Sequence, residues 1–299
     1  MNDNFRMLFE KPNLSELNDR YTVVDMHFHS KHSDGKNTVT EIADQARHLG
    51  IGIAVTDHNC IAAAVEIDKH EDVFSIPGIE ITSREGTHIL VYFYDIDSLK
   101  KFNALHVKPH MGNEVMSSIS LDMEEIIQRA RAFNTLIVFP HPYCAAYTGI
   151  NNSYFSENRL RKMYETVDGV EVINAGNLKK WNLKSAVLGF NLNKAITGGS
   201  DGHYLKQMGR VVSYAECKRD RKEFLDAVKQ KKNRVIGKEF NMLRKVTANG
   251  MKLKSNFKNY PDLVEKNIKY SYNLINLKSK TLKDNVKRRL NEKIKGHQT

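Results

Sequence analysis

The stretch Val23-Val24-Asp25-Met26-His27-Phe28-His29 decides how the rest of this 299-residue chain is interpreted. It begins as a short apolar run, which is typical of a buried strand, and it ends in two histidines one residue apart. Because residues i and i+2 of an extended chain point to the same side, both imidazoles face one direction and can grip one ion. The stretch therefore predicts a strand with metal-binding groups at its carboxyl end.

Six further strands are expected, each short, rich in Val and Ile and apolar without clean alternation, as strands covered on both faces are. The seven candidates are 23–26, 51–56, 74–80, 88–93, 136–140, 169–174 and 195–200. Helices are expected at 40–49, 120–133, 157–165 and 221–231. Strands alternating with helices predict an α/β fold with a mostly parallel sheet, either open or closed into a barrel.

Histidines and acids recur where these strands end. Beyond the first strand lies Asp34, and the later strand ends carry Thr56-Asp57-His58, Pro77-Gly78-Ile79-Glu80, Pro140-His141-Pro142 and Ser200-Asp201-Gly202-His203. His88 begins the fourth strand, so it joins the others only if that strand pairs differently from its neighbours. In α/β folds the carboxyl ends of parallel strands and the loops after them build the active site. We therefore expect these side chains to meet at one rim.

Imidazole together with carboxylate suits Zn, Mn or Fe, and nine such side chains suit two or three ions, with Glu80 able to bridge a pair. Each motif alone has a simpler interpretation as a structural histidine or a turn. The joint recurrence of six of the twelve histidines at one rim favours the metal centre. The other six are assigned to helices, loops or the tail: His32, His48, His70, His106, His110 and His297.

The series Asp-x-His-x-His, Thr-Asp-His-Asn, Pro-Gly-Ile-Glu-Ile, His-Ile-Leu, Pro-His-Pro and Ser-Asp-Gly-His resembles the polymerase and histidinol phosphatase (PHP) family of metal-dependent phosphoesterases. The resemblance runs from about residue 23 to 214 and implies a distorted seven-stranded, TIM-like β/α barrel. Some members carry a large helical insertion that residues 92–139 lack, so no substrate is carried over from them.

The resemblance also implies a ligand set in which no position is missing. The first ion would take His27, His29, Glu80 and Asp201. Glu80 would bridge to a second ion held with His88 and His141, and a third would take Asp34, His58 and His203. A complete set indicates an active enzyme.

No Ser, Cys or Thr is paired with a base in a triad-like pattern, so water activated between two ions is the expected nucleophile. Asp201, Glu80 and His203 are the expected catalytic residues, with Asp201 orienting the nucleophile. The expected substrate-binding residues are Arg210, Tyr143 and Asn174.

Several neighbouring polar residues keep two interpretations each. A surface salt bridge is the alternative for Arg210, and a buried polar pair is the alternative for Glu171 and Asn174. Asp25 and Asp57 either orient imidazoles or cap turns at strand ends.

The net charge of +11 is concentrated at one end of the chain. Residues 1–240 carry 31 basic and 31 acidic residues, whereas residues 241–299 carry 15 and 4. We therefore expect a PHP-type domain over 20–240 and a basic extension over 241–299, helical because its apolar residues recur at spacings of mostly four or seven after Pro261. The extension is interpreted as a solvated helix face, a nucleic-acid contact or a subunit contact.

Composition narrows the function further. A mean hydropathy of −0.51, the absence of long apolar runs and three scattered cysteines predict a cytoplasmic protein without membrane spans or disulfides. The expected function is hydrolysis of the phosphate ester of a small metabolite or nucleotide, with two or three divalent ions (Mn, Zn or Fe). The alternatives are a nuclease that uses the basic extension and a non-catalytic metal-binding regulatory module, and a homo-oligomer remains open.

Overall fold

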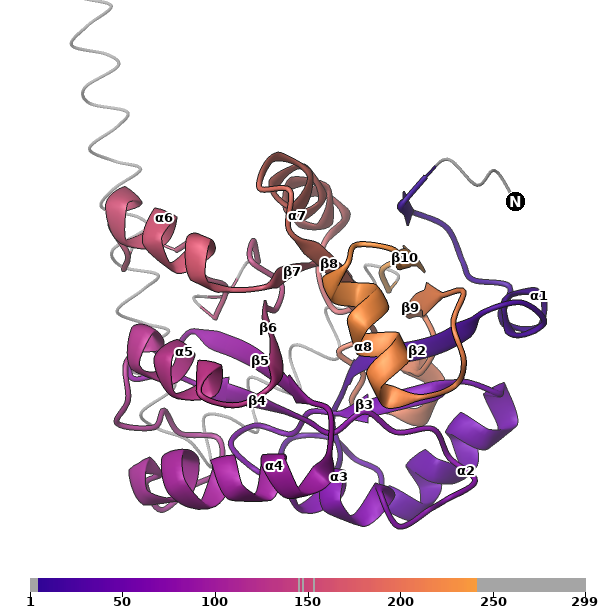
Figure 1. The fold of residues 1–299 in the computed structure, drawn as a ribbon, viewed down its shortest axis with the longest axis horizontal. Helices are drawn as coiled ribbons and strands as arrows, with labels where there is room; N and C mark the ends of the chain where they lie inside the picture. Colours follow the sequence, from indigo (N-terminus) through magenta and orange to yellow (C-terminus); the bar gives the residue numbers. More distant parts are fainter. Residues whose placement is uncertain (1–4, 145, 147, 153, 241–299) are drawn as a thin grey trace, which may run out of the picture.

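The computed structural model describes residues 5–240 except residues 145, 147 and 153. In this part of the chain the strands form two five-stranded sheets, in the orders β1-β10-β9-β2-β3 and β4-β5-β6-β7-β8 (Figure 1). The strands are β1 (Met7–Leu8), β2 (Thr22–Phe28), β3 (Gly52–Val55), β4 (Gly78–Thr82), β5 (His88–Phe93), β6 (Thr135–Phe139), β7 (Gly169–Asn174), β8 (Ala195–Gly199), β9 (Val211–Ala215) and β10 (Arg234–Gly237).

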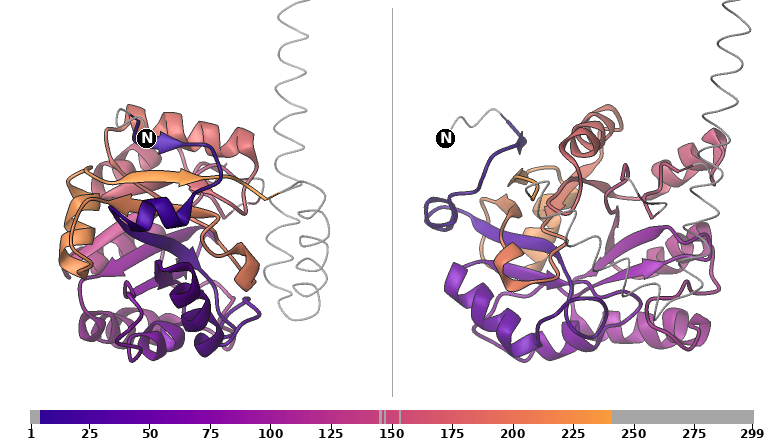
Figure 2. Two further views of the ribbon diagram at one scale, coloured as in Figure 1. Left: turned by 90° about the vertical axis from the view of Figure 1, so that its right-hand side faces the viewer. Right: turned by 180° about the vertical axis from the view of Figure 1, so that it is seen from behind.

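Helices lie around the strands, as Figures 1 and 2 show from three sides. They are α1 (Leu14–Asn18), α2 (Val39–Leu49), α3 (Ala62–Ile67), α4 (Ile96–Phe102), α5 (Met123–Arg131), α6 (Glu157–Thr166), α7 (Lys179–Asn191) and α8 (Arg221–Lys229), with short helical turns at Asn103–Val107, Lys108–His110 and Leu205–Gln207. None of the described helices is long and apolar enough to cross a membrane.

Local sequence signals fix the helix ends. Thr38 and Glu41 form a capping box before α2, and Gly50 ends that helix in the left-handed conformation (φ 70°). Asp122 caps α5 in the same way. The four predicted helices are present as α2, α5, α6 and α8. α7 was not predicted because its apolar residues surround the helix instead of forming one stripe.

The seven predicted strands are present as β2 to β8, but the mostly parallel sheet was wrong. β5 pairs antiparallel with both β4 and β6, and β9 pairs antiparallel with β2 and β10. The physical reason is the connection between β4 and β5, which is only residues 83–87 long. A parallel pair needs a crossover of a dozen or more residues, so these two strands form a hairpin.

The described strands do not close into one continuous barrel. Isolated bridges join the two sheets at Phe28–Gly202 and at His58–Glu80. One edge of β2 pairs with β3, and the unpredicted strand β9 covers the other edge over Thr22–Val24, so the residues after β8 meet β2 only beyond β9, at the Phe28–Gly202 bridge. The architecture is therefore an α/β fold of two mixed sheets that meet where β2, β3, β4 and β8 end. The predicted helical extension over 241–299 lies outside the described residues.

Candidate metal centre

The nine predicted ligands come together at one rim of the strands. β2 ends with His27 and Phe28 and is followed directly by His29, and loops after β2, β3, β6 and β8 contribute most of the others. Glu80 lies in the middle of β4 and not at the strand end where the sequence placed it. Because β5 runs antiparallel to its neighbours, its first residue lies at the rim where β4 and β6 end. The sequence analysis placed His88 at the rim only if its strand pairs differently from its neighbours, and β5 does so. The nine are His27, His29, Asp34, His58, Glu80, His88, His141, Asp201 and His203.

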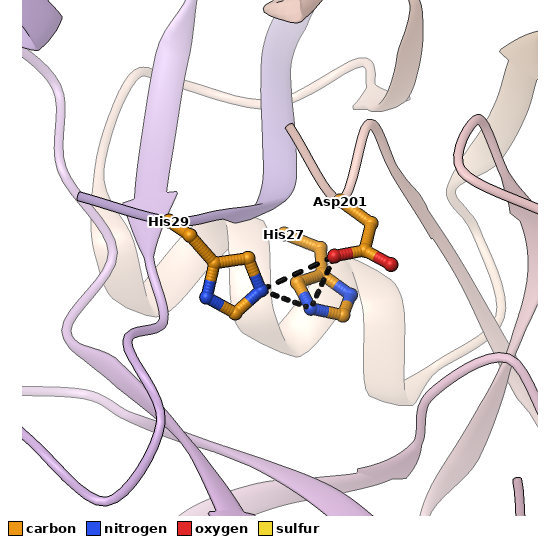
Figure 3. A group of neighbouring side chains, drawn as sticks. All are labelled: His27, His29 and Asp201. Atoms are coloured by element: carbon orange, nitrogen blue, oxygen red, sulfur yellow. Dashed lines mark hydrogen bonds and ion pairs between the residues drawn. The ribbon is translucent and has the colours of Figure 1, made fainter. Parts of the chain in front are cut away.

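The tightest group contains His27, His29 and Asp201 (Figure 3). The two Nε2 atoms are 3.1 Å apart, and Asp201 Oδ1 lies 3.2 Å from His29 Nε2 and 3.6 Å from His27 Nε2. Glu80 Oε2 lies 3.4 Å from each of the same nitrogens. Two donor atoms about 2.1 Å from one ion, at angles of about 90–110°, are separated by about 3.0–3.5 Å. The spacing of the His27, His29 and Asp201 atoms thus fits a single divalent ion, and Glu80 Oε2 lies at ligand spacing from both of the nitrogens.

Glu80 faces a second group with its other oxygen. Its Oε1 lies 3.0 Å from His88 Nδ1 and 3.4 Å from His141 Nε2. One oxygen toward each group is the arrangement that a bridging carboxylate requires.

The third group is looser than the resemblance implied. Asp34 Oδ2 lies 2.9 Å from His203 Nε2, whereas Asp34 Oδ1 is 3.9 Å from His58 Nε2. His58 Nδ1 is 3.1 Å from Glu80 Oε2, so this ring lies between the third group and the first. Asp34 Oδ1 also lies 3.6 Å from His29 Nδ1.

Unpaired imidazole nitrogens test whether the centre fits a metal. The Nδ1 atoms of His29 and His58 are buried and form no hydrogen bond within the described residues, although Glu80 Oε2 lies 3.1 Å from His58 Nδ1. Leaving such an atom unpaired costs about 1–3 kcal/mol. A set of buried imidazoles and carboxylates whose donor atoms converge, with some of them left without a hydrogen bond, fits divalent cations.

Electrostatics inside the centre couple the acids to the rings. Burial raises the pKa of Glu80, but the imidazoles of His88, His58 and His27 outweigh it and hold that pKa well below its ordinary value. Burial lowers the pKa of His27, but the carboxylates of Glu80, Glu171 and Asp201 outweigh it and raise that pKa well above the ordinary value. Ionised carboxylates therefore share this space with the His27 ring, which attracts a proton when no metal ion competes, whereas burial lowers the pKa of His58 well below its ordinary value.

Glu171 on β7 holds two of the candidate ligands from behind. Its Oε1 lies 3.1 Å from His27 Nδ1, and its Oε2 accepts hydrogen bonds from the His141 backbone N–H (2.9 Å) and from Asn174 Nδ2 (2.8 Å). Asn174 Nδ2 also donates to Asp201 Oδ2 at 3.3 Å. The pair is buried, as one sequence interpretation had it, and it also contacts the ligand set.

Asp25 and Asp57 hold backbone turns. Asp25 accepts hydrogen bonds from the N–H groups of Ser200 (2.8 Å) and Gly209 (2.9 Å), and burial raises its pKa to about 6. Asp57 accepts from Ser30 N–H at 2.7 Å. Within the described residues neither carboxylate contacts an imidazole ring, so the turn-capping interpretation is the correct one.

Two of the candidate ligands have unusual backbone conformations that sequence reasoning did not anticipate. His141 has a φ of 31° and Asp201 a φ of 48°. For residues other than glycine such angles are uncommon and cost about 1–3 kcal/mol each. In both cases the bend follows the end of a strand and turns the side chain toward the centre.

The predicted substrate-binding residues have different surroundings. Asn174 contacts Asp201, as described above. Tyr143 follows His141 by two residues, and its carbonyl accepts a hydrogen bond from Asn177 Nδ2 at 2.6 Å. Arg210 precedes β9, and in the described part of the chain no hydrogen bond or ion pair joins its guanidinium to the nine residues. The role of all three in substrate binding stays a prediction.

Comparisons of the sequence with known proteins agree with this geometry. A family model described as the PHP domain matches residues 25–294. An uncharacterized protein of Methanocaldococcus jannaschii is 28% identical over 187 residues, which cover 58% of this chain and 90% of that protein. A 3′,5′-nucleoside bisphosphate phosphatase of Chromobacterium violaceum is 35% identical over 69 residues, but these cover only 22% of this chain and 24% of the phosphatase.

Two solved structures have the same fold. A two-domain protein from Bacteroides vulgatus that contains a predicted PHP-like metal-dependent phosphoesterase superposes with a TM-score of 0.56 at 18% identity, over 79% of this chain and 69% of its own. The lesion-specific endonuclease PfuEndoQ from Pyrococcus furiosus superposes with a TM-score of 0.60 at 20% identity, over 72% of this chain and 57% of its own. At these identities the likeness establishes the fold alone.

Proposed function

The chain belongs to the PHP domain family and is a hydrolase acting on phosphate ester bonds, and from that premise we propose that it hydrolyses the phosphate ester of a small metabolite or nucleotide. The nine clustered side chains would hold two or three divalent ions, with Mn, Zn and Fe as the candidates. The observation that carries the proposal is that the Nε2 atoms of His27 and His29 lie 3.1 Å apart and each lies 3.2–3.6 Å from a carboxylate oxygen of Asp201 and of Glu80.

Each group has a separate task in this proposal. His27, His29 and Asp201 would hold one ion, and His88 and His141 a second, with one Glu80 oxygen for each. His203, with Asp34 and His58, would complete a third site. Divalent ions, when bound, activate water at neutral pH and neutralise the charge on phosphoryl oxygens.

The chain's own residues orient these groups. Glu171 accepts the Nδ1 proton of His27, which leaves Nε2 of that ring to face the other donors. The Asn174 amide engages Oδ2 of Asp201 and so directs Oδ1 toward the imidazoles, where it would orient the attacking water. His203 Nδ1 donates to the Asp201 carbonyl at 2.9 Å, so its Nε2 faces Asp34 and the rim.

Limited exposure supports a small substrate or a chain end. The side chains of His27, His29 and Glu80 are at most 1% exposed, and the most open of the nine, Asp201, is 22% exposed. A terminal phosphate can approach groups buried to this degree, whereas a phosphate within a continuous duplex cannot unless the duplex is distorted. The short match to a bisphosphate phosphatase is consistent with this choice.

Nuclease activity is the second candidate, because residues 241–299 carry 15 basic and 4 acidic residues and because the endonuclease PfuEndoQ has the same fold. Removing residues 241–299 distinguishes the two candidates. If the truncated protein no longer cleaves RNA but still hydrolyses small phosphate esters, the nuclease is favoured. In that case the affinity of the full-length protein for nucleic acid should fall steeply as the salt concentration rises.

Two features of the fold belong to the same proposal. We propose that β2 to β8 are an open form of the distorted seven-stranded barrel that the resemblance implies, with the Phe28–Gly202 and His58–Glu80 bridges between the two sheets. We also propose that the catalytic domain spans 20–240 and that 241–299 is a separate basic extension. The last described residue supports this boundary, because Phe240 N–H still bonds to the Ala175 carbonyl of the domain at 3.0 Å.

The decisive experiment assays a panel of phosphorylated metabolites and short oligonucleotides with Mn²⁺, Zn²⁺, Fe²⁺ and Mg²⁺ supplied separately. Hydrolysis should require a metal ion and disappear in Asp201→Ala and His58→Ala, but persist in His48→Ala, a substitution of an exposed histidine on α2. Metal binding without hydrolysis of any member of the panel would instead indicate the regulatory module.

A further inference from the structure

A strip of aromatic and lysine side chains borders the metal centre. It consists of Tyr143, in the loop after His141, and of Lys180, Trp181 and Lys184 on α7. We infer that this aromatic–lysine strip binds the nucleotide part of the substrate, with the rings against the base and the ammonium groups against a second phosphate, distinct from the one at the metal centre. The inference rests on the proposed function and narrows its substrate class to nucleotides or oligonucleotide ends, in preference to sugar phosphates.

The strip is connected directly to the centre. Asn174 contacts Asp201, and a Cβ placed on Gly176 would lie 3.2 Å from Asp201 Oδ2, so residues 174–176 pass beside this carboxylate. The next residue, Asn177, holds the Tyr143 carbonyl at 2.6 Å, and α7 begins two residues later. A ligand whose phosphate lies at Asp201 therefore has the strip within reach.

The lysines are placed against rings instead of acids. Lys184 Nζ lies 5.6 Å from the ring centroid of Tyr143 and 4.9 Å from that of Trp181, and Lys180 Nζ lies 4.9 Å from the Trp181 centroid. α7 contains no acidic residue, and among the described residues no carboxylate forms an ion pair with Lys179, Lys180 or Lys184. The positive charge of the strip is thus uncompensated.

This arrangement is unfavourable unless an anion is bound. Like charges at positions i and i+4, such as Lys180 and Lys184, repel each other on a helix. Lysines in the first turn also oppose the positive end of the helix dipole. A phosphate group would remove both penalties.

The aromatic rings identify the rest of the ligand. Bases stack on aromatic side chains with an energy of about 1–3 kcal/mol each, whereas a sugar phosphate offers no such face. Combined cation and ring contacts next to a phosphoryl centre therefore match a nucleotide. Their polar character does not match an apolar ligand.

Trp181 gives a direct readout, because it is the only tryptophan of the 299 residues. Titration of the full-length protein with adenosine 3′,5′-bisphosphate, which has one phosphate for the centre and one for the lysines, should quench its fluorescence, and the dissociation constant should rise about three- to tenfold in Lys184→Gln. Lys184→Arg should restore much of the affinity. Glucose 6-phosphate should leave the signal unchanged.

Lys229→Gln is the matched control. Lys229 Nζ lies 5.3 Å from the Tyr94 centroid, so the substitution removes a contact of the same kind. Tyr94 follows the carboxyl end of β5, whereas His88 at the amino end belongs to the centre, so this pair lies at the opposite rim. Nucleotide affinity should not change in this variant.

An activity assay separates failure of this inference from failure of the proposed function. In Lys184→Gln the KM for a nucleotide should rise while its kcat and both constants for glucose 6-phosphate stay the same. The inference about the strip is wrong if the unmodified protein hydrolyses nucleotides and sugar phosphates with equal kcat/KM. It is also wrong if Lys184→Gln and Lys229→Gln have equal effects. Either result would leave the proposed phosphoesterase activity unaffected. Quenching without hydrolysis of any ester would support the strip and overturn the proposed function.

Discussion

Two clusters of acidic side chains in this protein differ in what surrounds them. One is the centre of nine residues described above, and the other is formed by Glu85, Asp122 and Glu124. In both, potential ligand atoms come close enough to hold a cation, each carboxylate with imidazoles in the first and carboxylates alone in the second. Only the partners of these oxygens distinguish a binding site from a structural network.

In the second cluster arginines neutralise the acids. Arg159 contacts Glu124 at 2.5 and 2.6 Å and Glu85 at 2.7 Å, and Arg84 contacts Asp122 at 3.0 Å. Asp122 also caps α5, and Glu85 accepts a backbone hydrogen bond from Met123 at 3.2 Å. The Arg159 guanidinium, with its pKa raised mainly by the hydrogen bonds to Glu124, already occupies the position that a cation would take.

In the first cluster Glu80 and Asp201 face imidazoles, and among the described residues neither forms an ion pair with an arginine. Imidazole is neutral when it binds a metal, so the carboxylate charge of Glu80 and Asp201 remains to be balanced. The comparison teaches that proximity of acids is weak evidence for a metal site. Acids whose partners are buried neutral donors are stronger evidence.

The largest effect should come from Glu80→Ala, which removes the carboxylate that faces two groups at once. We expect kcat/KM for a phosphate ester to fall by about a thousandfold or more, because both sites lose a ligand. The matched substitution Glu85→Ala in the second cluster should change it by less than about threefold. Comparable losses in both variants would mean that the clusters are not functionally different.

Metal removal should have the second largest effect. A metal ion present at about a hundred times its dissociation constant stabilises the folded state by about 2.7 kcal/mol, so chelation should lower the melting temperature by several degrees. Asp201→Ala should abolish most of this difference and Glu124→Ala none of it. If neither added metal nor chelator changes the melting temperature, the nine residues do not form a metal centre.

The pH dependence of the metal-free protein follows from the same groups. The raised pKa of His27 gives stability that is present below pH 6.5 and is lost as pH rises through the raised value. The lowered pKa of Glu80 gives stability that is present above pH 4.5 and is lost as pH falls through the lowered value. We expect both contributions to be complete between pH 4.5 and 6.5, and metal affinity to increase with pH as protons leave the rings. Denaturant titrations at several pH values, with and without metal, check both trends.

Asn174→Ala tests whether Asn174 orients the metal ligand Asp201 or contacts the substrate. Loss of the amide that orients Asp201 should lower kcat by about tenfold and weaken metal binding while KM changes little. Asn191→Ala, at the exposed end of α7, is the control. If KM rises and kcat is unchanged, Asn174 is a substrate contact, as the sequence alone predicted.

Arg159→Ala should have the smallest effect. The side chain is 35% exposed, so solvent screens its ion pairs, and we expect the free energy of unfolding to fall by about 1 kcal/mol with activity unchanged. Arg161→Ala, an exposed substitution on the same helix, should leave stability within about 0.5 kcal/mol. A loss of activity in Arg159→Ala would place the second cluster in the catalytic machinery.

The sequence predicted more of the candidate site than of the fold. His27 and His29 are predictable because period two is a local property of extended chain, and strand ends are marked by short apolar runs that stop. The capping residues of α2 and α5 are also local signals. β9, β10 and α7 were missed because their apolar residues show neither a clear period nor a clear boundary.

What the sequence alone determined is therefore the set of nine residues, the seven strands that carry most of them and the uneven charge of the chain. Only the tertiary structure decided that β5 runs antiparallel and so brings His88 to the rim, that β9 occupies the edge of β2, and that Glu171 and Asn174 hold His27 and Asp201 from behind. It also decided that Arg159 neutralises one acidic cluster while the other keeps its charge. The physical reason is that the direction of strand pairing and the compensation of charge depend on which distant segments of the chain meet. The local periodicity of the sequence does not depend on those contacts and so cannot predict them.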